Sequence, residues 1–473
     1  MLISGWRSQC HASPRLSQVT AALTQRRRLL TLAIESSCDD TSVAILDKHD
    51  APPRQSVHGA ALPAATLHFH EKITANNKEY LGVHPVVAVE SHRQNLATLI
   101  TKALQSLPDA PSASDDPSST IRVRARSGWT RKRKPDLVSV TRGPGMRSCL
   151  AAGIDTAKGL AVGWQVPVVG VNHMQAHALT PRLVSAMAPN STPVVEPAFP
   201  FLSLLVSGGH TLLLHSTGLI DHTVLATTSD MAIGDAVDKM ARVVVPTEII
   251  RQSDEIMYGR LLEQFAFPLG EEEHAYAAPA TRKDELARNI TRWGWAIGAP
   301  LAETRSGSKS KSMEYSFSGL GSAVKRIADN AGAVLGIDER KDLAREAMRL
   351  AFEHLASRVV IALEKLRAKN VNSDLGIGTL VVSGGVASNS YLRTILRSFL
   401  DVRGFSHMQL SFPPPSLCTD NAAMIAWAGI ETFEAGWESK LDMTALRKWS
   451  LDPRAGDGGI LGVGGWKKIE SNR

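Results

Sequence analysis

Cysteine is scarce in this chain of 473 residues, and its four copies show no pairing pattern. They stand at positions 10, 38, 149 and 418, and no Cys-x-x-Cys spacing occurs. Disulfide-stabilised folds place several cysteines at close, regular spacings. The scatter therefore disfavours a disulfide framework and fits free thiols in a reducing compartment.

Long apolar runs are also missing. No stretch approaches the roughly 20 apolar residues that a membrane-spanning helix needs, and we expect no membrane association. The composition, 43% hydrophobic and 21% charged, is typical of a soluble globular protein. A chain of this length exceeds one ordinary hydrophobic core, so it predicts two lobes with insertions.

Carboxylates are absent from residues 1–30, which contain five arginines and several serines. The first acidic residue is Glu35. An arginine-rich, serine-containing, acid-free leader is typical of a mitochondrial transit peptide, and a disordered basic tail is the alternative. We therefore expect a transit peptide at 1–30 and a location in the mitochondrial matrix. Since five of the seven net positive charges lie here, the basicity of the whole chain is no evidence for nucleic-acid binding.

Strand and helix patterns alternate after the leader. Two β-hairpins are predicted, one around the polar turn Ser36–Thr41 and one around the turn Ser207–Gly209. With the long helical segments between strands, they predict an α/β fold with partly parallel sheets and a duplicated lobe. The expected layout is a leader at 1–30, an N-terminal lobe at 31–172 with a flexible insertion at 106–135, a C-terminal lobe at 173–430 with an insertion at 267–312, and a C-terminal extension at 431–473.

The insertion at 106–135 ends in seven basic residues between Arg122 and Lys134, with Trp129 among them. Such a segment could follow a phosphate backbone. A solvated, disordered insert has the same composition, and the sequence leaves both interpretations open.

Two histidines four residues apart, His173 and His177, suggest a metal site. On a helix this spacing places both side chains on one face, where their imidazole nitrogens can bind one divalent ion. Asp420, far downstream, could add a carboxylate oxygen and leave coordination positions open, as a catalytic site requires. This donor set suits zinc, iron or manganese. Spacing alone does not separate ligands from histidines that simply lie on a surface or in a core.

The tetrapeptide VSGG occurs twice, at Val206–Gly209 and at Val382–Gly385, each time after an apolar strand. Glycine lets the backbone approach a ligand, and exposed N–H groups favour phosphate oxygens. No lysine follows, so neither is a Walker loop. A plain turn is the alternative for each.

Three further polar residues, Asp39, Asp238 and Asn389, are candidates for catalysis or ligand binding. Their alternative roles are, in that order, to form a turn, to lie on a solvated face and to cap a helix N-terminus.

Eight segments in order resemble one family, the tRNA N6-threonylcarbamoyladenosine transferases, formerly classed as glycoproteases. The chain looks most similar to the mitochondrial branch, and the resemblance extends from about Leu30 to Trp427. The segments are IESSCDDTSVAIL, GPG at 143–145, NHMQAH, FLSLLVSGGHT, GDAVDKMAR, SFSGL, VVSGGVASN and LCTDNAAMIA.

The resemblance implies the two-lobed fold of actin, sugar kinases and heat-shock chaperone ATPases, with duplicated ribonuclease-H-like lobes. It also implies transfer of a threonylcarbamoyl group from threonylcarbamoyl-adenylate to N6 of adenosine 37, in tRNAs that read codons beginning with A. One divalent metal ion per subunit, a separate synthase that supplies the adenylate, and a homodimer are further implications. Whether the insertions at 106–135 and 267–312 contact tRNA stays open.

Residue by residue, the resemblance makes His173, His177 and Asp420 the metal ligands. It places the adenylate against Leu205, Val206, Ser207, Gly208 and Gly209, with Asp238 and Asn389 also in contact with it. The family's Tyr-Pro-Gly-Gly-Pro segment is replaced by MYGRLLEQF, which makes Gly259 and Glu263 the counterparts. Asp40 and Gly321 also depart from the family, which has glutamate and lysine there. Asp39 is the candidate for orienting or deprotonating the adenosine amine.

Two other functions compete with this interpretation. An ATP-dependent small-molecule kinase of the same fold would need a catalytic aspartate but no His pair. A non-catalytic nucleotide-binding scaffold is compatible with the altered 258–263 segment. A zinc peptidase is disfavoured because Gln175 stands where such enzymes place a glutamate base.

Overall fold

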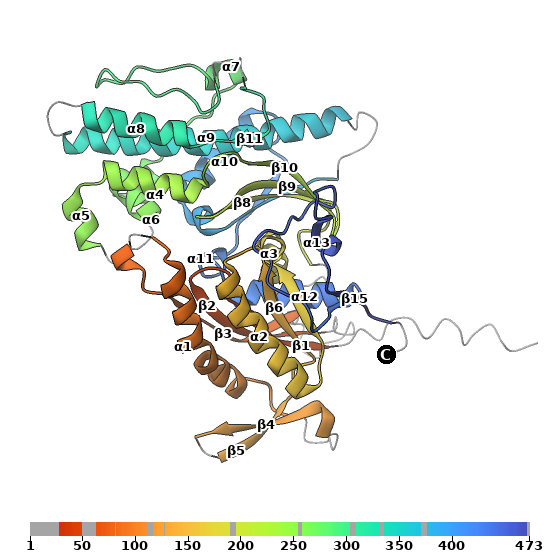
Figure 1. Cartoon of the computed structure of the whole chain (residues 1–473). Coiled ribbons are helices and arrows are strands. Elements are labelled where there is room, and N and C mark those ends of the chain that lie inside the picture. The colour runs from red at the N-terminus through yellow and green to blue at the C-terminus, as the bar shows by residue number, and fades with distance from the viewer. Residues whose placement is uncertain are drawn as a thin grey trace, which may run out of the picture.

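The computed structural model describes residues 28–49, 63–80, 82–110, 117–126, 128–189, 195–253, 258–302, 309–330, 335–369 and 376–470. Two β-sheets, each covered by helices, dominate these residues (Figure 1). Most of the predicted leader, residues 1–27, lies outside the described part of the chain. No helix within the described residues is long and apolar enough to cross a membrane.

The first sheet has the strand order β15-β14-β7-β6-β1-β2-β3. One end of this sheet is an antiparallel β1-β2-β3 meander, and β6 and β7, which run parallel to β1, continue the sheet from β1. Its strands are β1 (Leu29–Glu35), β2 (Asp40–Lys48), β3 (Ala65–Thr74), β6 (Leu137–Gly143), β7 (Val168–Asn172), β14 (Trp437–Ser439) and β15 (Trp466–Lys468).

The second sheet, β11-β10-β9-β8-β12-β13, repeats this plan. Strands β8, β9 and β10 form an antiparallel meander, and β12 and β13 continue parallel to β8. Its strands are β8 (Phe201–Val206), β9 (Thr211–Ser216), β10 (His222–Thr228), β11 (Glu314–Tyr315), β12 (Thr379–Ser383) and β13 (Gln409–Ser411). The shared order, three antiparallel strands and then two parallel ones, confirms the predicted duplicated ribonuclease-H-like, actin-like fold.

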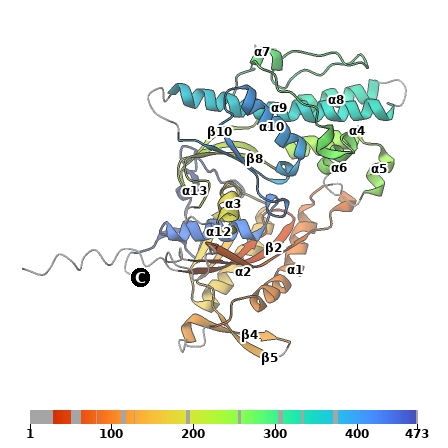
Figure 2. The same ribbon diagram turned by 180° about the vertical axis from the view of Figure 1, so that it is seen from behind.

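Helices cover the sheets in separate layers (Figures 1 and 2). In the first lobe, α1 and α2 pack on one face of the sheet. In the second, α4, α6, α8, α9 and α10 form the outer layer. The helices are α1 (Pro85–Gln105), α2 (Arg147–Trp164), α3 (His173–Met187), α4 (Ile233–Val244), α5 (Thr247–Gln252), α6 (Tyr258–Ala266), α7 (Arg282–Glu285), α8 (Ser318–Asn330), α9 (Ile337–Lys369), α10 (Ser390–Val402), α11 (Pro415–Cys418), α12 (Ala422–Glu434) and α13 (Gly459–Gly462).

Two helices lie between the sheets, α3 and α12, and they pack against each other. The sequence places α12 in the C-terminal lobe, but this helix contacts β1, β2, β6 and β7 of the first sheet. Its buried Trp427 shares a core with Ala33 of the first sheet and Phe201 and Val381 of the second. The chain therefore returns to its first lobe at its C-terminal end, and this crossing brings residue 420 back to α3.

The insertion at 106–135 is partly regular, contrary to the expectation of a flexible segment. It contains an antiparallel hairpin of β4 (Thr120–Ala125) and β5 (Gly128–Arg133), which projects from the first lobe in both views (Figures 1 and 2). Ile121 and Val123 alternate with arginines, and such alternation is typical of a β-strand. The many charged residues in this segment make the strand pattern hard to recognise in the sequence. Residues 111–116 lie outside the described part of the chain.

Strand β1 begins inside the segment predicted as leader, so the boundary at residue 30 needs correction. Leu29 and Leu30 are buried. Arg28 pairs with Asp47 at 2.5 Å. Burial raises the pKa of this carboxyl, but the His68 imidazole 3.7 Å away, the hydrogen bonds from Arg28 and the charge of Arg133 outweigh burial and lower the pKa to about 2. The described fold therefore begins at Arg28.

A chain that starts at residue 31 is expected to be less stable than one that starts at residue 28. Burying two leucine side chains contributes roughly 1.5–3 kcal/mol each, so we expect a loss of about 3–6 kcal/mol. Urea unfolding of the two chains measures the difference. A chain that starts at residue 21 is the control and should match the chain from 28. Equal midpoints for the chains from 28 and 31 would contradict the placement of β1.

Candidate active site

The histidine pair lies on the first turns of α3, directly after β7. The side chain of Asn172 caps this helix by accepting hydrogen bonds from the backbone N–H groups of Met174 and Gln175. His173 and His177 then lie on one face with their ring centroids 4.7 Å apart, as their spacing predicts. Both side chains are buried.

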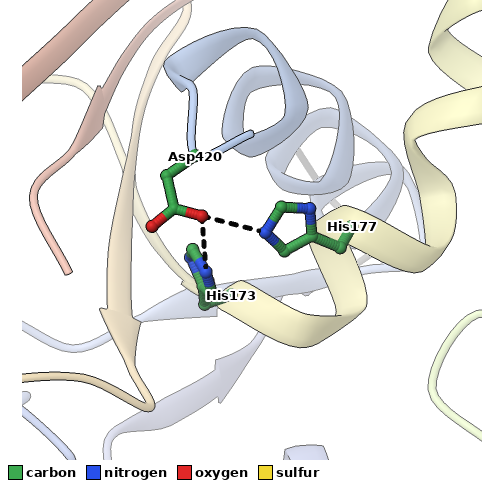
Figure 3. A group of neighbouring side chains, drawn as sticks. All are labelled: His173, His177 and Asp420. Carbon is green, nitrogen blue, oxygen red and sulfur yellow. Dashed lines mark hydrogen bonds and ion pairs between the residues drawn. The ribbon is translucent and has the colours of Figure 1, made fainter. Parts of the chain in front are cut away.

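Asp420 reaches the pair from the loop between α11 and α12 (Figure 3). Its Oδ1 atom lies 3.1 Å from His177 Nε2 and 3.3 Å from His173 Nε2. Ligands of a tetrahedral ion bound at 2.0–2.1 Å lie about 3.3–3.4 Å apart, so these separations fit one small divalent ion. The three predicted ligands converge, and two imidazoles and a carboxylate are a donor set that suits a divalent metal ion.

Behind the pair, Glu35 at the end of β1 fixes the orientation of His173. Its Oε2 lies 3.1 Å from His173 Nδ1 and accepts from Thr141 Oγ1 at 2.5 Å. Its Oε1 accepts from the Ser37 backbone N–H at 2.6 Å. A carboxylate on one imidazole nitrogen leaves the other free as a ligand atom, a common support for metal-binding histidines. The only sign of this role in the sequence is that Glu35 is an acidic residue at the end of an apolar strand.

The electrostatics of the cluster favour a cation. Burial lowers the pKa of His173, but the carboxylates of Asp420 and Glu35 outweigh burial and raise this pKa well above its ordinary value. Burial raises the pKa of Asp420, but His173 and His177 hold it well below its usual range. His177, by contrast, has its pKa lowered, chiefly by burial. The carboxylates of Glu35 and Asp420 thus stabilise a positive charge placed between them.

The two glycine turns meet at the carboxyl ends of β8 and β12, which are adjacent and parallel. Gly384 has φ +102, and a Cβ atom there would lie 2.3 Å from the carbonyl oxygen of Val206. A Cβ on Gly385 would lie 3.8 Å from Thr419, the neighbour of Asp420. The glycine turns and the metal cluster therefore belong to one site.

Helix α4 starts against the first glycine turn. The N–H of Gly234 donates to the carbonyl oxygen of Ser207 at 3.2 Å, and a Cβ on Gly234 would lie 2.8 Å from Gly208. Leu205 and Val206 are buried in β8, whereas Ser207 is partly exposed and Gly208 and Gly209 are exposed. A helix N-terminus beside exposed turn N–H groups favours phosphate oxygens.

The remaining predicted binding residues occupy α4, α6 and the start of α10. Asp238 Oδ1 accepts from the Gly259 backbone N–H at 2.7 Å. Glu263 accepts from the backbone N–H and the hydroxyl of Ser390, at 2.7 and 2.5 Å. Asn389 is the N-cap of α10, accepting from Leu392 N at 3.0 Å. The altered segment after 258 is thus helical, and Glu263 stabilises the N-terminus of α10.

Asp238 carries a pH dependence that can be measured. Burial raises its pKa from 3.8 to about 6, although the Gly259 N–H and Arg242 oppose this shift. Between about pH 4 and pH 6 the unfolded carboxyl is ionised while the folded one keeps its proton, so stability falls as the pH rises through this window and is constant above it.

Asp238→Asn should therefore be more stable than the native chain above pH 6, by roughly 1–2 kcal/mol after allowance for partial exposure. The two chains should converge below pH 4. Urea unfolding at several pH values measures this difference. A variant that is less stable than the native chain at pH 7.5 would show that ionised Asp238 is favourably bound.

Asp39, the candidate for contact with the acceptor amine, follows β1 and accepts from Asn77 Nδ2 at 3.0 Å. Burial raises its pKa, and the charges of Asp40 and Asp420 add to the effect. Its neighbour Asp40 pairs with Lys72 at 2.8 Å, and Lys72 also donates to Thr419 Oγ1 at 2.8 Å. Lys72, which sequence analysis did not single out, links the first hairpin to the Asp420 loop.

A cavity of about 630 Å³ adjoins the cluster on the side of the C-terminal extension. His210 and Met174 line one wall, and Arg447, Trp449 and Arg454 belong to the other. The pKa of His210 is lowered to about 4, first by burial and then by the charge of His173. The extension at 431–473 is therefore part of the wall beside the site.

Comparison with known proteins identifies the family. The family model TsaD, tRNA N6-adenosine threonylcarbamoyltransferase, matches residues 125–427, well over half of the chain. The chain belongs to this family. The family resemblance and the enzyme class inferred from the sequence are thereby confirmed.

Full-length relatives agree with the family match. A mitochondrial tRNA N6-adenosine threonylcarbamoyltransferase of Schizosaccharomyces pombe is 36% identical, covering 96% of this chain and 92% of that protein. The tRNA N6-adenosine threonylcarbamoyltransferase of Paracoccus denitrificans is 34% identical, covering 92% and 97%. Among solved structures, HypF of T. kodakarensis aligns with 86% of this chain and 48% of that chain at 14% identity and a TM-score of 0.39. The fold assignment therefore rests on the strand order of this chain.

Proposed function

We propose that this TsaD family member transfers a threonylcarbamoyl group from threonylcarbamoyl-adenylate to N6 of adenosine 37 in tRNAs that read codons beginning with A, in mitochondria. The observation that carries the proposal is the convergence of His173, His177 and Asp420 beside two glycine turns. Family membership favours this reaction over a small-molecule kinase or a non-catalytic scaffold. The mitochondrial name of the S. pombe relative supports the location.

The metal site is proposed to hold one divalent ion, which would polarise a phosphoryl or carbonyl oxygen as a Lewis acid. His173, His177 and Asp420 would hold it. Glu35 keeps Nε2 of His173 directed toward Asp420 through its contact with Nδ1. Zinc, iron and manganese all suit this donor set.

The glycine turns are proposed to hold the adenylate. Backbone N–H groups of Gly208 and Gly209, beside the start of α4, can donate to the phosphate, and Ser207 shapes the turn because its own N–H donates to the His210 carbonyl oxygen. Asp238, Gly259, Glu263 and Asn389 would border the nucleotide, although Glu263 and Asn389 also hold the start of α10.

The acceptor amine of adenosine is a weak nucleophile, so positioning against the mixed anhydride should supply much of the acceleration. Asp39 is proposed to orient that amine or accept its proton, because its raised pKa brings it closer to the operating pH of a general base. Phosphate donors in the glycine turns would stabilise the departing AMP.

Several finer assignments belong to this proposal. A separate synthase would supply the adenylate, and the chain would act as a homodimer in the matrix. Residues before Arg28 would form the transit peptide. The first lobe would run from Arg28 to Asn172 and would also take in α12, β14 and β15, and the second lobe would begin after residue 172.

The reaction is tested by reconstitution. The chain from residue 28 is mixed with unmodified tRNA, threonine, bicarbonate, ATP and an adenylate-forming enzyme, and nucleoside mass spectrometry measures threonylcarbamoyladenosine. We expect product only when tRNA and the adenylate-forming enzyme are both present. ATP consumption by the chain alone would favour a kinase. Adenylate retention without product would favour a scaffold.

A further inference from the structure

The β4–β5 hairpin has two chemically different faces. On one, Val123 is buried, Ile121 packs against the core of the first lobe, and Lys132 pairs with Asp109 at 2.7 Å. Since side chains alternate along a strand, the residues between these point the other way. The hairpin is therefore anchored by one face and presents the other to solvent.

The outer face carries four exposed residues that form two cross-strand pairs. Arg122 is opposite Arg131, and Arg124 is opposite Trp129. Trp129 is 61% exposed, and the Arg122 guanidinium lies 5.2 Å from the centroid of its ring. These four residues, Arg122, Arg124, Trp129 and Arg131, are called the arginine face.

The positive charge of the arginine face is not compensated within the described residues. None of its three arginines forms an ion pair there, whereas Arg133 on the same strand pairs with Asp47 and Asp136. Like charges directly opposite each other destabilise a strand pair. The opposed arginines therefore lower the stability of the free protein, and a bound polyanion would relieve their repulsion.

We propose that the arginine face binds the sugar–phosphate backbone of the tRNA substrate, an inference that rests on the proposed function. Guanidinium groups bind phosphates with two parallel hydrogen bonds, and an exposed indole can stack on an unpaired base. The hairpin projects from the end of the first lobe that lies away from α3 (Figures 1 and 2). It therefore contacts tRNA away from the reacting nucleotide and contributes to affinity rather than chemistry.

The test replaces Arg122, Arg124 and Arg131 together by glutamine and measures binding of an unmodified tRNA transcript at several salt concentrations. Each lost phosphate contact reduces the salt slope by about 0.7–0.9, so the triple variant should lose about 2 in slope. We expect at least a tenfold higher Kd near 0.1 M salt, a raised KM for tRNA, and unchanged kcat at saturating tRNA.

Three matched variants separate local contacts from other effects. Replacing Lys365, Arg367 and Lys369 of α9 by glutamine changes net charge equally and should alter Kd far less. Lysine at the three hairpin positions should keep most of the salt slope. Trp129→Ala should weaken binding without changing the slope. A glutamine variant that matches the α9 control in Kd and slope overturns the proposal, as does one that changes kcat but not KM.

The outcome also separates this inference from the proposed function. If the native chain neither binds tRNA nor forms product, the proposed function fails. If it does both and the hairpin variants behave like it, only the tRNA contact fails. Binding of the native chain, but not the glutamine variant, to anionic phospholipid vesicles, with tRNA affinity unchanged, would assign the face to a membrane and overturn the tRNA contact.

Discussion

Asp420→Ala is expected to reduce kcat/KM for threonylcarbamoyl transfer by at least about 10²–10³-fold. Replacing a residue that merely supports a metal ligand costs roughly 10–100-fold, and Asp420 is itself a predicted ligand that contacts both histidines. His173→Ala should have a similar effect. The measurement is initial rate of threonylcarbamoyladenosine formation at matched protein concentration, with metal content determined on the same samples.

The controls for this prediction separate ligation from structure. His407→Ala removes an exposed histidine away from the cluster and should leave rate and metal content unchanged. Glu35→Gln should reduce metal affinity less than Asp420→Ala does, because Glu35 acts through His173. Full activity of Asp420→Ala, or activity of the native chain that survives complete metal removal, would contradict the proposed role of the cluster.

Gly384→Ala is expected to be the most disruptive single-methyl change at the nucleotide turns. The new Cβ would lie 2.3 Å from the Val206 carbonyl oxygen, and the residue would keep φ +102. With ψ 166, Gly384 lies in a backbone region that essentially only glycine adopts. Holding an alanine there costs roughly 1–3 kcal/mol, and overpacking adds about 1–3 kcal/mol. We expect a loss of roughly 3 kcal/mol in stability and transfer reduced by more than about tenfold, since both glycine turns must move.

The neighbouring glycine provides the control. A methyl group on Gly385 would meet only Thr419, at 3.8 Å, which is an ordinary contact. Gly385→Ala should therefore unfold close to the native midpoint in urea, while Gly384→Ala unfolds earlier. Equal stability and activity of the two variants would contradict the close approach of β8 and β12 at their carboxyl ends.

The sequence was most informative where a local pattern determines geometry. The four-residue spacing of His173 and His177 places both on one face of α3, and the glycine turns follow buried parallel strands. The strand pattern around Ser36–Thr41 and Ser207–Gly209 predicted both antiparallel hairpins, which the strand pairing confirms. The roles of these residues in metal and adenylate binding stay predictions.

Long-range packing accounts for what the sequence did not reveal. Glu35 supports His173 across 138 residues of chain, and no local pattern records that contact. Helix α12 returns to the first sheet because its apolar side chains complete a core shared by both lobes. Apolar residues such as Leu29 and Leu30 fit both a leader and a first strand. Only their pairing with β2 shows that the fold starts before residue 31.

The central claim is tested most directly with preformed threonylcarbamoyl-adenylate, the chain from residue 28 and unmodified tRNA in a single-turnover reaction. Nucleoside mass spectrometry measures threonylcarbamoyladenosine, and chromatography measures AMP in the same tube. The account predicts equimolar formation of both products by the native chain and neither above background with Asp420→Ala. Adenylate hydrolysis to AMP without modified tRNA, or equal product from both proteins, would contradict it.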